Sequence, residues 1–499
     1  MELFSNLWLG LQVAGEPINL AYCFFGVFLG TFVGVLPGIG ALAAISLLLP
    51  ITYHIPPTAA IIMLAGAQYG GSTASILLNL PGTPSSAVTC LDGYPMASKG
   101  KAGIALFVTT IASLVGAMSG LILLVLFSPA IAEIGLKFGP AEFFSMMVLG
   151  LVAASSMSSG SAAKGLAMVV FGLLLGMVGT DVNSGVARYH FNVPELMDGI
   201  SLVALAMGLF GVAEVVRCIN AAETSKVPEK VTMRSMVPSK KEFTDTIAPM
   251  LRGSALGALP GVGPSIAAFM SYAIEKRVAK DPSRFGKGAI EGISAPESAN
   301  NASAQTAFVP SLSLGIPGDA VMAVMLGALI IHGITPGPML ITEQPELFWG
   351  LVVSFMIGNI MLVILNLPTI GMWVALLRTP FAWMYPAILV FVALGVYSVN
   401  NNEFDIYMVA VLGIMGYALM VLRFEPAPLL LGYILGPMVE ENLRRALLLS
   451  RGDPSIFIDR PISAGLLGFT AVLLGWAVWS TVRKSLASKR DLEVAEGRA

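Results

Sequence analysis

Proline-glycine breaks inside long apolar stretches constrain this chain more than any other feature. The segment SILLNLPGTPSSAV, residues 75–88, carries Pro-Gly-Thr-Pro where an apolar helix would otherwise continue. Proline and glycine both disfavour a helix interior. In hydrocarbon, a broken helix leaves backbone N–H and C=O groups unpaired, at a cost of several kcal/mol each. We therefore expect a chain that keeps such breaks in a membrane to use the freed backbone groups for a ligand.

The composition places these breaks in a membrane. Of the 499 residues, 56% are hydrophobic and only 12% are charged, and the mean hydropathy is +0.81. Soluble domains carry about 25% charged residues. The sequence predicts an all-α polytopic membrane protein with roughly ten to twelve transmembrane helices, since each span needs about 20 apolar residues. A net charge of −2 argues against a nucleic-acid partner.

One glycine-proline phrase occurs twice. GTFVGVLPGIG, residues 30–40, and GSALGALPGVG, residues 253–263, share the skeleton G-x-x-x-G-x-L-P-G-[I/V]-G. A second pair of similar segments follows: LPGTPSSAV comes after the first copy, and IPGDAVMAV comes after the second. We therefore predict two related halves, arranged as inverted repeats with re-entrant or broken helices at the Pro-Gly motifs. Matching interrupted segments in two halves are the best sequence indication of a transporter binding site.

Charged residues suggest the boundaries of these halves. We predict a first transmembrane repeat over 1–222, a polar cytoplasmic connecting loop over 223–245, a second repeat over 246–482 and a polar cytoplasmic tail over 483–499. The loop and the tail are placed in the cytoplasm by their lysines and arginines. Basic clusters also flank the apolar stretch 246–273, which favours a re-entrant hairpin with its tip at 260–263. A single kinked span is the alternative.

Helix starts beside the breaks are the expected binding site. A restarted helix offers free N–H groups and about half a positive charge, which suits a carboxylate. The predicted substrate-binding residues are Gly38, Asn79, Gly82, Thr83, Ser85, Ser86, Gly261, Asn301 and Gly318. The predicted cation-binding residues are Ser72, Thr73, Asn300, Ser303 and Asp319. Asp319 is equally consistent with a helix cap, and packing kinks are the structural alternative for the breaks.

The acidic residues of the second half form part of the same expectation. Glu291, Glu297 and Asp319 lie where the chain has no Lys or Arg between Lys287 and Arg378. An ionisable residue inside a membrane costs about 2.5–3.5 kcal/mol on insertion scales and therefore indicates function. Glu297 opens the polar run ESANNASAQT, which we expect to bind ligand hydroxyls or an ion.

The same motifs carry a family resemblance. GTFVGVLPGIG, YGGSTASILLNLPGTPSSAVTCLDGYPMASKGKAGIAL and EGISAPESANNASAQTAFVPSLSLGIPGD resemble the TctA family, the large membrane subunit of bacterial tripartite tricarboxylate transporters. The resemblance runs from about Leu20 to Leu474. It implies uptake of a di- or tricarboxylate such as citrate across the bacterial inner membrane, driven by a Na⁺ or H⁺ gradient. It also implies a small four-span TctB-like subunit and a periplasmic TctC-like solute-binding protein as partners, and no cofactor beyond a coupling Na⁺.

Two other functions are weighed against this one. A passive anion channel also uses rings of backbone carbonyls, so it stays open as an alternative. An intramembrane enzyme is disfavoured, because the sequence has no H-E-x-x-H motif, and GIPGD has Ile316 where an aspartyl protease motif needs glycine. No Walker-type phosphate-binding motif occurs either, which agrees with a gradient-driven transporter.

Overall fold

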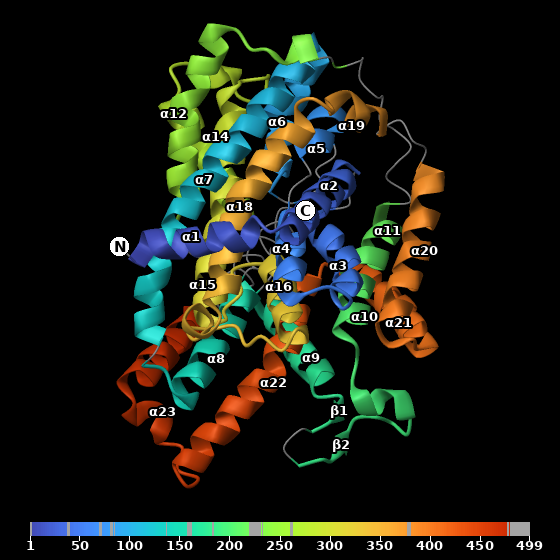
Figure 1. The fold of residues 1–499 in the computed structure, drawn as a ribbon, viewed down its shortest axis with the longest axis vertical. Helices are drawn as coiled ribbons and strands as arrows, with labels where there is room; N and C mark the ends of the chain where they lie inside the picture. Colours follow the sequence, from blue (N-terminus) through green and yellow to red (C-terminus); the bar gives the residue numbers. More distant parts are fainter. Residues whose placement is uncertain are drawn as a thin grey trace, which may run out of the picture. The chain divides into compact units, whose positions relative to one another are not determined.

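The computed structural model describes most of the chain and is almost entirely helical. Described are residues 2–36, 40–68, 72–79, 83, 85–135, 137–156, 162–181, 184–218, 231, 233–259, 263–376, 381–476 and 479. Within these ranges the strands are β1 (Gly179–Thr180) and β2 (Ala187–Arg188), which pair antiparallel. The predicted all-α class is confirmed (Figure 1).

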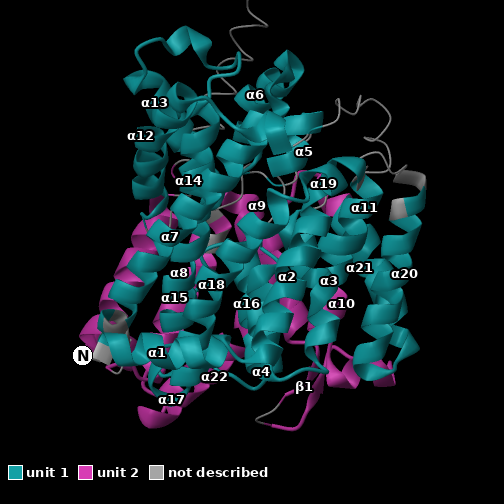
Figure 2. Cartoon of the chain, turned by 45° about the horizontal axis from the view of Figure 1, so that its top comes forward, with its two compact units in different colours: residues 1–135, 206–417 teal, residues 136–205, 418–499 magenta. Residues whose placement is uncertain are grey.

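The chain forms two compact units, shown in different colours in Figure 2. Unit 1 comprises residues 1–135 and 206–417, and unit 2 comprises residues 136–205 and 418–499. Each unit therefore draws on both sides of the central polar loop. The units reflect spatial contacts, whereas the boundaries at 222, 245 and 482 rest on sequence repetition and charge, so the repeat boundaries stay a prediction.

The first part of unit 1 is a series of helices, two of which begin at proline. Proline is favoured in the first turn because its missing N–H is unpaired there in any case, and Pro17 and Pro57 occupy this position. The helices are α1 (Glu2–Ala14), α2 (Pro17–Val35), α3 (Ala41–Thr52), α4 (Pro57–Gly66), α5 (Ser72–Leu78), α6 (Ala87–Met96), a π-helical turn η1 (Ala97–Lys101) and α7 (Ala102–Gly135).

The later part of unit 1 also consists of helices. Its elements are η3 (Met207–Val212), α11 (Ala213–Cys218), η4 (Met233–Met236), α12 (Lys240–Gly257), α13 (Pro264–Val278), η5 (Pro282–Arg284), α14 (Glu291–Thr306), α15 (Phe308–Leu314), α16 (Ala320–Ile331), α17 (Leu340–Glu343), α18 (Pro345–Asn366), α19 (Ile370–Leu376), α20 (Phe381–Asn400) and α21 (Glu403–Val421), whose last turn enters unit 2. A capping box between Ser239 and Glu242 starts α12.

All four glycine-proline phrases separate two helices. They lie between α2 and α3, between α5 and α6, between α12 and α13, and between α15 and α16. The prediction that helices break there is confirmed by the helix ends on either side. Three of the tips, at 37–39, 80–82 and 260–262, lie outside the described residues.

The α12–α13 segment forms a hairpin of two helices that share a partner. Arg252 of α12 is ion-paired with Glu275 of α13, with Nε and Oε2 2.9 Å apart. Both helices pack against α14. Asp245, near the start of α12, interacts electrostatically with Arg284, just beyond the end of α13. The start of α12 and the end of α13 therefore lie together, as the hairpin interpretation expects, while its re-entry into a membrane stays a prediction.

The apolar helices fit a membrane protein without settling the number of spans. Four described helices are long and apolar enough to cross a bilayer: Pro17–Val35, Ala87–Ser128, Pro345–Asn366 and Glu403–Val421. Eight shorter apolar helices have 10–17 residues. The helix breaks divide the apolar stretches into pieces shorter than a span. The expected ten to twelve transmembrane helices and their inverted arrangement therefore stay predictions.

Unit 2 is built on α8 (Pro140–Ser156), α9 (Ala162–Gly176) and α22 (Pro426–Leu449). Its smaller elements are the β1–β2 hairpin, η2 (Pro194–Asp198), α10 (Leu202–Ala206) and α23 (Ile456–Asp459), and an apolar helix over Pro461–Trp476 follows. Glycines bring α9 and α22 together. A Cβ on Gly172 would overlap the carbonyl oxygen of Leu429, and one on Gly432 would overlap that of Val169. Such small residues allow close approach of helices within a membrane.

Candidate functional site

A buried carboxylate collects polar side chains from four helices of unit 1. Glu297 of α14 is 4% exposed. Ser72 Oγ of α5 lies 2.9 Å from both carboxylate oxygens, and Ser113 Oγ of α7 donates to Oε1 at 3.0 Å. Thr89 Oγ1 of α6 donates to Oε2 at 3.3 Å, and Asn301 Nδ2 donates to Oε1 at 3.2 Å. We call these five residues the Glu297 centre. Its members come from both halves of the sequence.

Glycine packing on two sides positions the helix that carries this carboxylate. On the α12 side, a Cβ on Gly253 or Gly257 would overlap a carbonyl oxygen of α14. On the α7 side, a Cβ on Gly116 or Gly120 would do the same. Helix α14 is therefore held by direct backbone contact with both neighbours. The repeated G-x-x-x-G phrase contributes the α12 side of this contact, which is a structural role for part of the motif.

The Glu297 centre lacks a compensating charge. All four hydrogen-bond partners of its carboxylate are neutral, and no Lys, Arg or His among the described residues interacts with it. Asn301 Nδ2 also donates to Ser113 Oγ at 3.1 Å, which fixes the hydroxyl beside the carboxylate. Oxygen atoms therefore dominate the site, and its net charge as an ionised group is negative.

Sequence reasoning identified part of this centre. The predicted residues Ser72 and Asn301 both contact Glu297. Glu297 itself was expected within a polar run but without a specific role, and Thr89 and Ser113 were missed. The spacing of Glu297 and Asn301, one helical turn apart, was the available signal for the α14 part. Nothing in the local sequence distinguishes Ser113 from other serines of apolar helices.

Beside the Pro81-Gly82 phrase, the described residues Thr83, Ser85 and Ser86 are hydrogen-bonded to one another. Ser86 N donates to Thr83 Oγ1 at 3.3 Å, and Thr83 N donates to Ser86 Oγ at 3.1 Å. Thr83 Oγ1 and Ser85 Oγ are 3.0 Å apart. This reciprocal pattern is a local turn before α6 that uses the N–H of Thr83 within the corner, and Ser86, the N-cap of α6, makes no side-chain capping bond. The hydroxyl oxygens keep lone pairs for a further partner.

The helix that follows the Pro317-Gly318 phrase is capped by an acidic residue. Asp319 is the N-cap of α16, and its Oδ1 accepts a hydrogen bond from Met322 N at 2.8 Å. The capping interpretation of Asp319 is confirmed by this bond, whereas its role as a cation ligand stays a prediction. Gly318 lies beside Ala307, where an added Cβ would make ordinary van der Waals contact.

The remaining predicted site residues are not brought into the Glu297 centre by any described contact. Ser303 is buried in α14, Thr73 and Asn300 are half-buried, and Asn79 is exposed with a left-handed φ of 58°. Gly38, Gly82 and Gly261 lie outside the described residues. Their assignment as substrate-binding or cation-binding residues stays a prediction.

A second buried acid in unit 1 has a structural explanation. Asp92 of α6 accepts hydrogen bonds from the backbone N–H groups of Gly288 and Ala289, at 2.7 and 2.8 Å, and from the Tyr272 hydroxyl at 2.9 Å. These N–H groups precede α14, so Asp92 stabilises the start of that helix. A side chain on Gly292 would overlap the carboxylate of Asp92.

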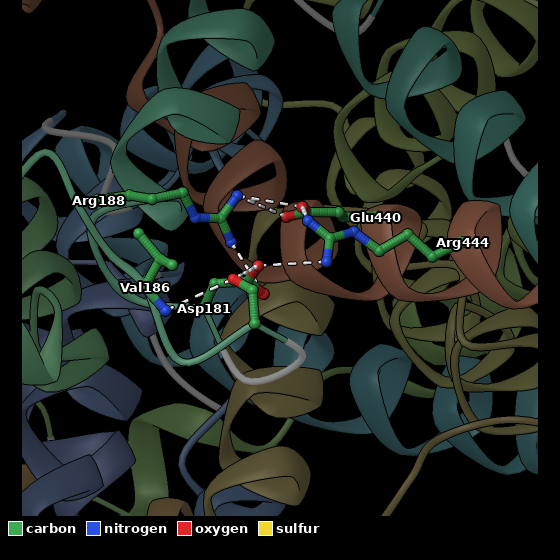
Figure 3. A network of polar contacts seen from close by, with 6 residues as sticks. Asp181, Val186, Arg188, Glu440 and Arg444 are labelled. Atoms are coloured by element: carbon green, nitrogen blue, oxygen red, sulfur yellow. Dashed lines mark hydrogen bonds and ion pairs between the residues drawn. The ribbon is translucent and has the colours of Figure 1, made fainter.

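Unit 2 contains a polar cluster of a different kind (Figure 3). Asp181, which precedes β2, is ion-paired with Arg188 at 3.3 Å and with Arg444 of α22 at 3.2 Å. Glu440 of α22 accepts from Arg188 at 3.0 Å and also pairs with Arg444. We call these four residues the Asp181 cluster. Its two acids and two arginines balance in charge, and they fasten the β1–β2 hairpin to α22.

Among the described residues, no group of three or more His, Cys, Asp or Glu side chains is arranged to hold a metal ion. The Glu297 centre instead presents one carboxylate with hydroxyl and amide groups. Such a set binds a proton or a hard monovalent cation by oxygen atoms.

Comparison with known proteins gives these features a family context. The family model described as "Tripartite tricarboxylate transporter TctA family" matches residues 20–431. An uncharacterized 52.8 kDa protein in the TAR-I ttuC' 3' region of Agrobacterium vitis is 50% identical over 499 residues, covering 98% of each chain. An uncharacterized protein in the TAR-II ttuC' 3' region of the same organism is 55% identical over 239 residues, covering 48% of this chain and 97% of that protein.

No solved structure matches the chain. The match of the family model spans all four glycine-proline phrases and every residue of the Glu297 centre. The relative in the TAR-I region extends the similarity over nearly the whole length. The chain belongs to the tripartite tricarboxylate transporter TctA family, whose members are membrane components of transporters.

Proposed function

We propose that this protein is the large permease subunit of a binding-protein-dependent secondary transporter that takes up a di- or tricarboxylate, citrate-like in chemistry, using a Na⁺ or H⁺ gradient. The observation that carries the proposal is the Glu297 centre. Ser72, Thr89 and Ser113 come from the first half of the sequence, and Glu297 and Asn301 come from the second. A polar site assembled from two repeats beside helix breaks is the arrangement found in secondary transporters.

The proposed substrate site lies at the glycine-proline corners. Helix starts at α6 and α16, with the hydroxyls of Thr83, Ser85 and Ser86, would hold the carboxylates. Gly38, Asn79, Gly82, Gly261, Asn301 and Gly318 complete the proposed substrate-binding set. The predicted cation-binding residues Ser72, Thr73, Asn300, Ser303 and Asp319 are candidates for the coupling cation, and of these Ser72 contacts Glu297. Movement of one repeat against the other then exposes the site to each side in turn.

The proposed partners and orientation follow from the family and from charge. A small four-span subunit and a periplasmic solute-binding protein complete the transporter in the inner membrane. The basic residues of the central loop and the C-terminal tail place both in the cytoplasm under the positive-inside rule. The repeats are proposed to be inverted, with α12–α13 as a re-entrant hairpin.

The test is uptake into proteoliposomes that contain this subunit, the small subunit and the binding protein. A panel of radiolabelled di- and tricarboxylates is offered with an inward Na⁺ gradient, with an inward proton gradient, or with neither. The proposal expects accumulation above the external concentration that collapses with one of the gradients. Equilibration without accumulation would instead identify a passive anion channel, and no movement of any carboxylate would reject the proposed substrate class.

A further inference from the structure

We propose that the Glu297 centre binds one Na⁺ ion, with the Glu297 carboxylate as the charged ligand and the hydroxyls of Ser72, Ser113 and Thr89 as neutral ligands. The inference rests on the proposed function, since it assigns the coupling ion of that transporter to a particular site. It replaces a dispersed set of predicted cation residues with a single cluster whose members are in contact.

The chemistry of the cluster favours a hard cation. Three hydroxyl oxygens lie within 2.9–3.3 Å of the two carboxylate oxygens. Each hydroxyl has two lone pairs and one hydrogen, so it keeps acceptor capacity while donating to the carboxylate. Hard cations select such oxygen ligands. A proton binds to one carboxylate oxygen alone, whereas a cation uses the oxygen atoms of several side chains at once.

The charge of the cluster calls for a cation as well. Among the described residues, the other buried glutamates are paired with arginine: Glu275 with Arg252, and Glu142 with Arg460. Glu297 has only neutral partners among the described residues. An uncompensated buried charge is strongly unfavourable. A bound Na⁺ supplies the missing charge without a permanent arginine, and it can leave again.

The position of the cluster explains how the ion acts on transport. Ser72 begins α5, directly after the break that follows α4, whereas Glu297 lies in the middle of α14, which is held by glycine contacts to α7 and α12. The neutral ligands Ser72 and Thr89 therefore meet the carboxylate only when α5 and α6 are packed against α14. Na⁺ binding stabilises this packed arrangement, and release of the ion loosens it.

The experiment compares Glu297→Gln with the exposed control Glu343→Gln, using the full-length purified subunit. Thermal unfolding is followed as NaCl replaces choline chloride at constant ionic strength, and again as pH is varied without Na⁺. We expect Na⁺ to raise the unfolding temperature of the wild type and of Glu343→Gln, and to leave Glu297→Gln unchanged. An equal Na⁺ response in Glu297→Gln overturns the proposal, as does a wild type that responds to pH but not to Na⁺.

Two further measurements keep the result independent of folding and of the proposed function. If Glu297→Gln fails to fold, Ser72→Ala serves instead, and its affinity for Na⁺ should fall about tenfold, the loss of one ligand group; an unchanged affinity overturns the site. In proteoliposomes, Glu297→Gln should exchange carboxylate across the membrane but lose Na⁺-driven accumulation. Accumulation by Glu297→Gln at the wild-type level overturns the site and leaves the proposed function standing. Na⁺ binding without any carboxylate movement supports the site and rejects the proposed function.

Discussion

The two polar clusters of this molecule hold acidic residues in opposite ways. In the Asp181 cluster of unit 2, two acids and two arginines neutralise each other. In the Glu297 centre of unit 1, a more deeply buried carboxylate has hydroxyl and amide partners alone. Both clusters satisfy the hydrogen-bonding capacity of their acids. They differ in whether the charge is compensated within the chain.

We propose that this difference separates a structural ion-pair cluster from a binding site. A compensated cluster keeps its geometry without any ligand, as suits the attachment of the β1–β2 hairpin to α22. An uncompensated cluster depends on a partner from outside the chain, so its stability varies with the presence of that partner. Counting buried acids alone would not distinguish the two, whereas identifying their partners does.

The largest expected effect is on the free energy of unfolding in the absence of Na⁺. Removing an acid should destabilise the protein at the Asp181 cluster but not at the Glu297 centre. Asp181→Asn should lower the free energy of unfolding by about 1–3 kcal/mol, because Arg188 and Arg444 lose a charged partner in a partly buried setting. Glu297→Gln should leave it unchanged or raise it, because it removes a charge without a counterion. Denaturant unfolding in detergent measures both. A loss of stability in Glu297→Gln as large as that in Asp181→Asn would break the comparison.

A smaller effect is expected when one serine that donates to the central acid of each cluster is replaced. Ser113→Ala removes a donor to Glu297, and Ser184→Ala removes the donor that lies 2.6 Å from Asp181 Oδ2. Ser113→Ala should weaken Na⁺ binding about five- to tenfold, the effect of about 1 kcal/mol. Ser184→Ala should leave Na⁺ affinity unchanged. Equilibrium Na⁺ titration of both variants gives the answer, and equal affinities would show that the Ser113 hydroxyl is not a ligand.

The pairing within the Asp181 cluster can be measured directly. A double-mutant cycle of Arg188→Gln and Glu440→Gln should give a coupling free energy of about 0.5–1.5 kcal/mol, because both side chains are partly exposed. The coupling should be the same with and without Na⁺. A coupling free energy that depends on Na⁺ would show that the Asp181 cluster is not independent of Na⁺ binding.

The smallest effect concerns a third acid, at the surface of unit 1. The Lys101 ammonium, followed by the Ser239 hydroxyl and N–H, lowers the pKa of Glu242 from 4.5 to about 2. A lowered pKa contributes stability above the ordinary value, and this contribution is lost as pH falls from 4.5 towards 2. The stability difference between wild type and Glu242→Gln should therefore be small at pH 7 and shrink on acidification. A difference that grows below pH 4.5 would contradict the assignment.

The interruptions of the helices at the Pro-Gly phrases could be predicted from the sequence, because they depend on local rules. Proline, glycine and apolar runs mark where helices begin and end, and the breaks at 37–40, 80–86, 260–263 and 315–319 all separate helices. The hairpin of α12 and α13 followed from the charges at its two ends. Asp319 as a helix cap followed from its position before α16.

The composition of the Glu297 centre could be predicted only in part. Its members lie far apart in the sequence, and 225 residues separate Ser72 from Glu297. Their meeting depends on how α5, α6 and α7 pack around α14, which a single sequence does not reveal. Serines in apolar helices usually bond their own backbone, as Ser119 and Ser128 do with carbonyls four residues earlier. Ser113 looks the same in sequence, and only the position of α14 gives it a different partner.

The most direct test of the account is equilibrium binding of radiolabelled Na⁺ to the purified subunit, compared among wild type, Glu297→Gln and Asp181→Asn. The account predicts a single saturable Na⁺ component in the wild type, its disappearance in Glu297→Gln and its persistence in folded Asp181→Asn. Saturable binding of the same affinity in wild type and Glu297→Gln would contradict it.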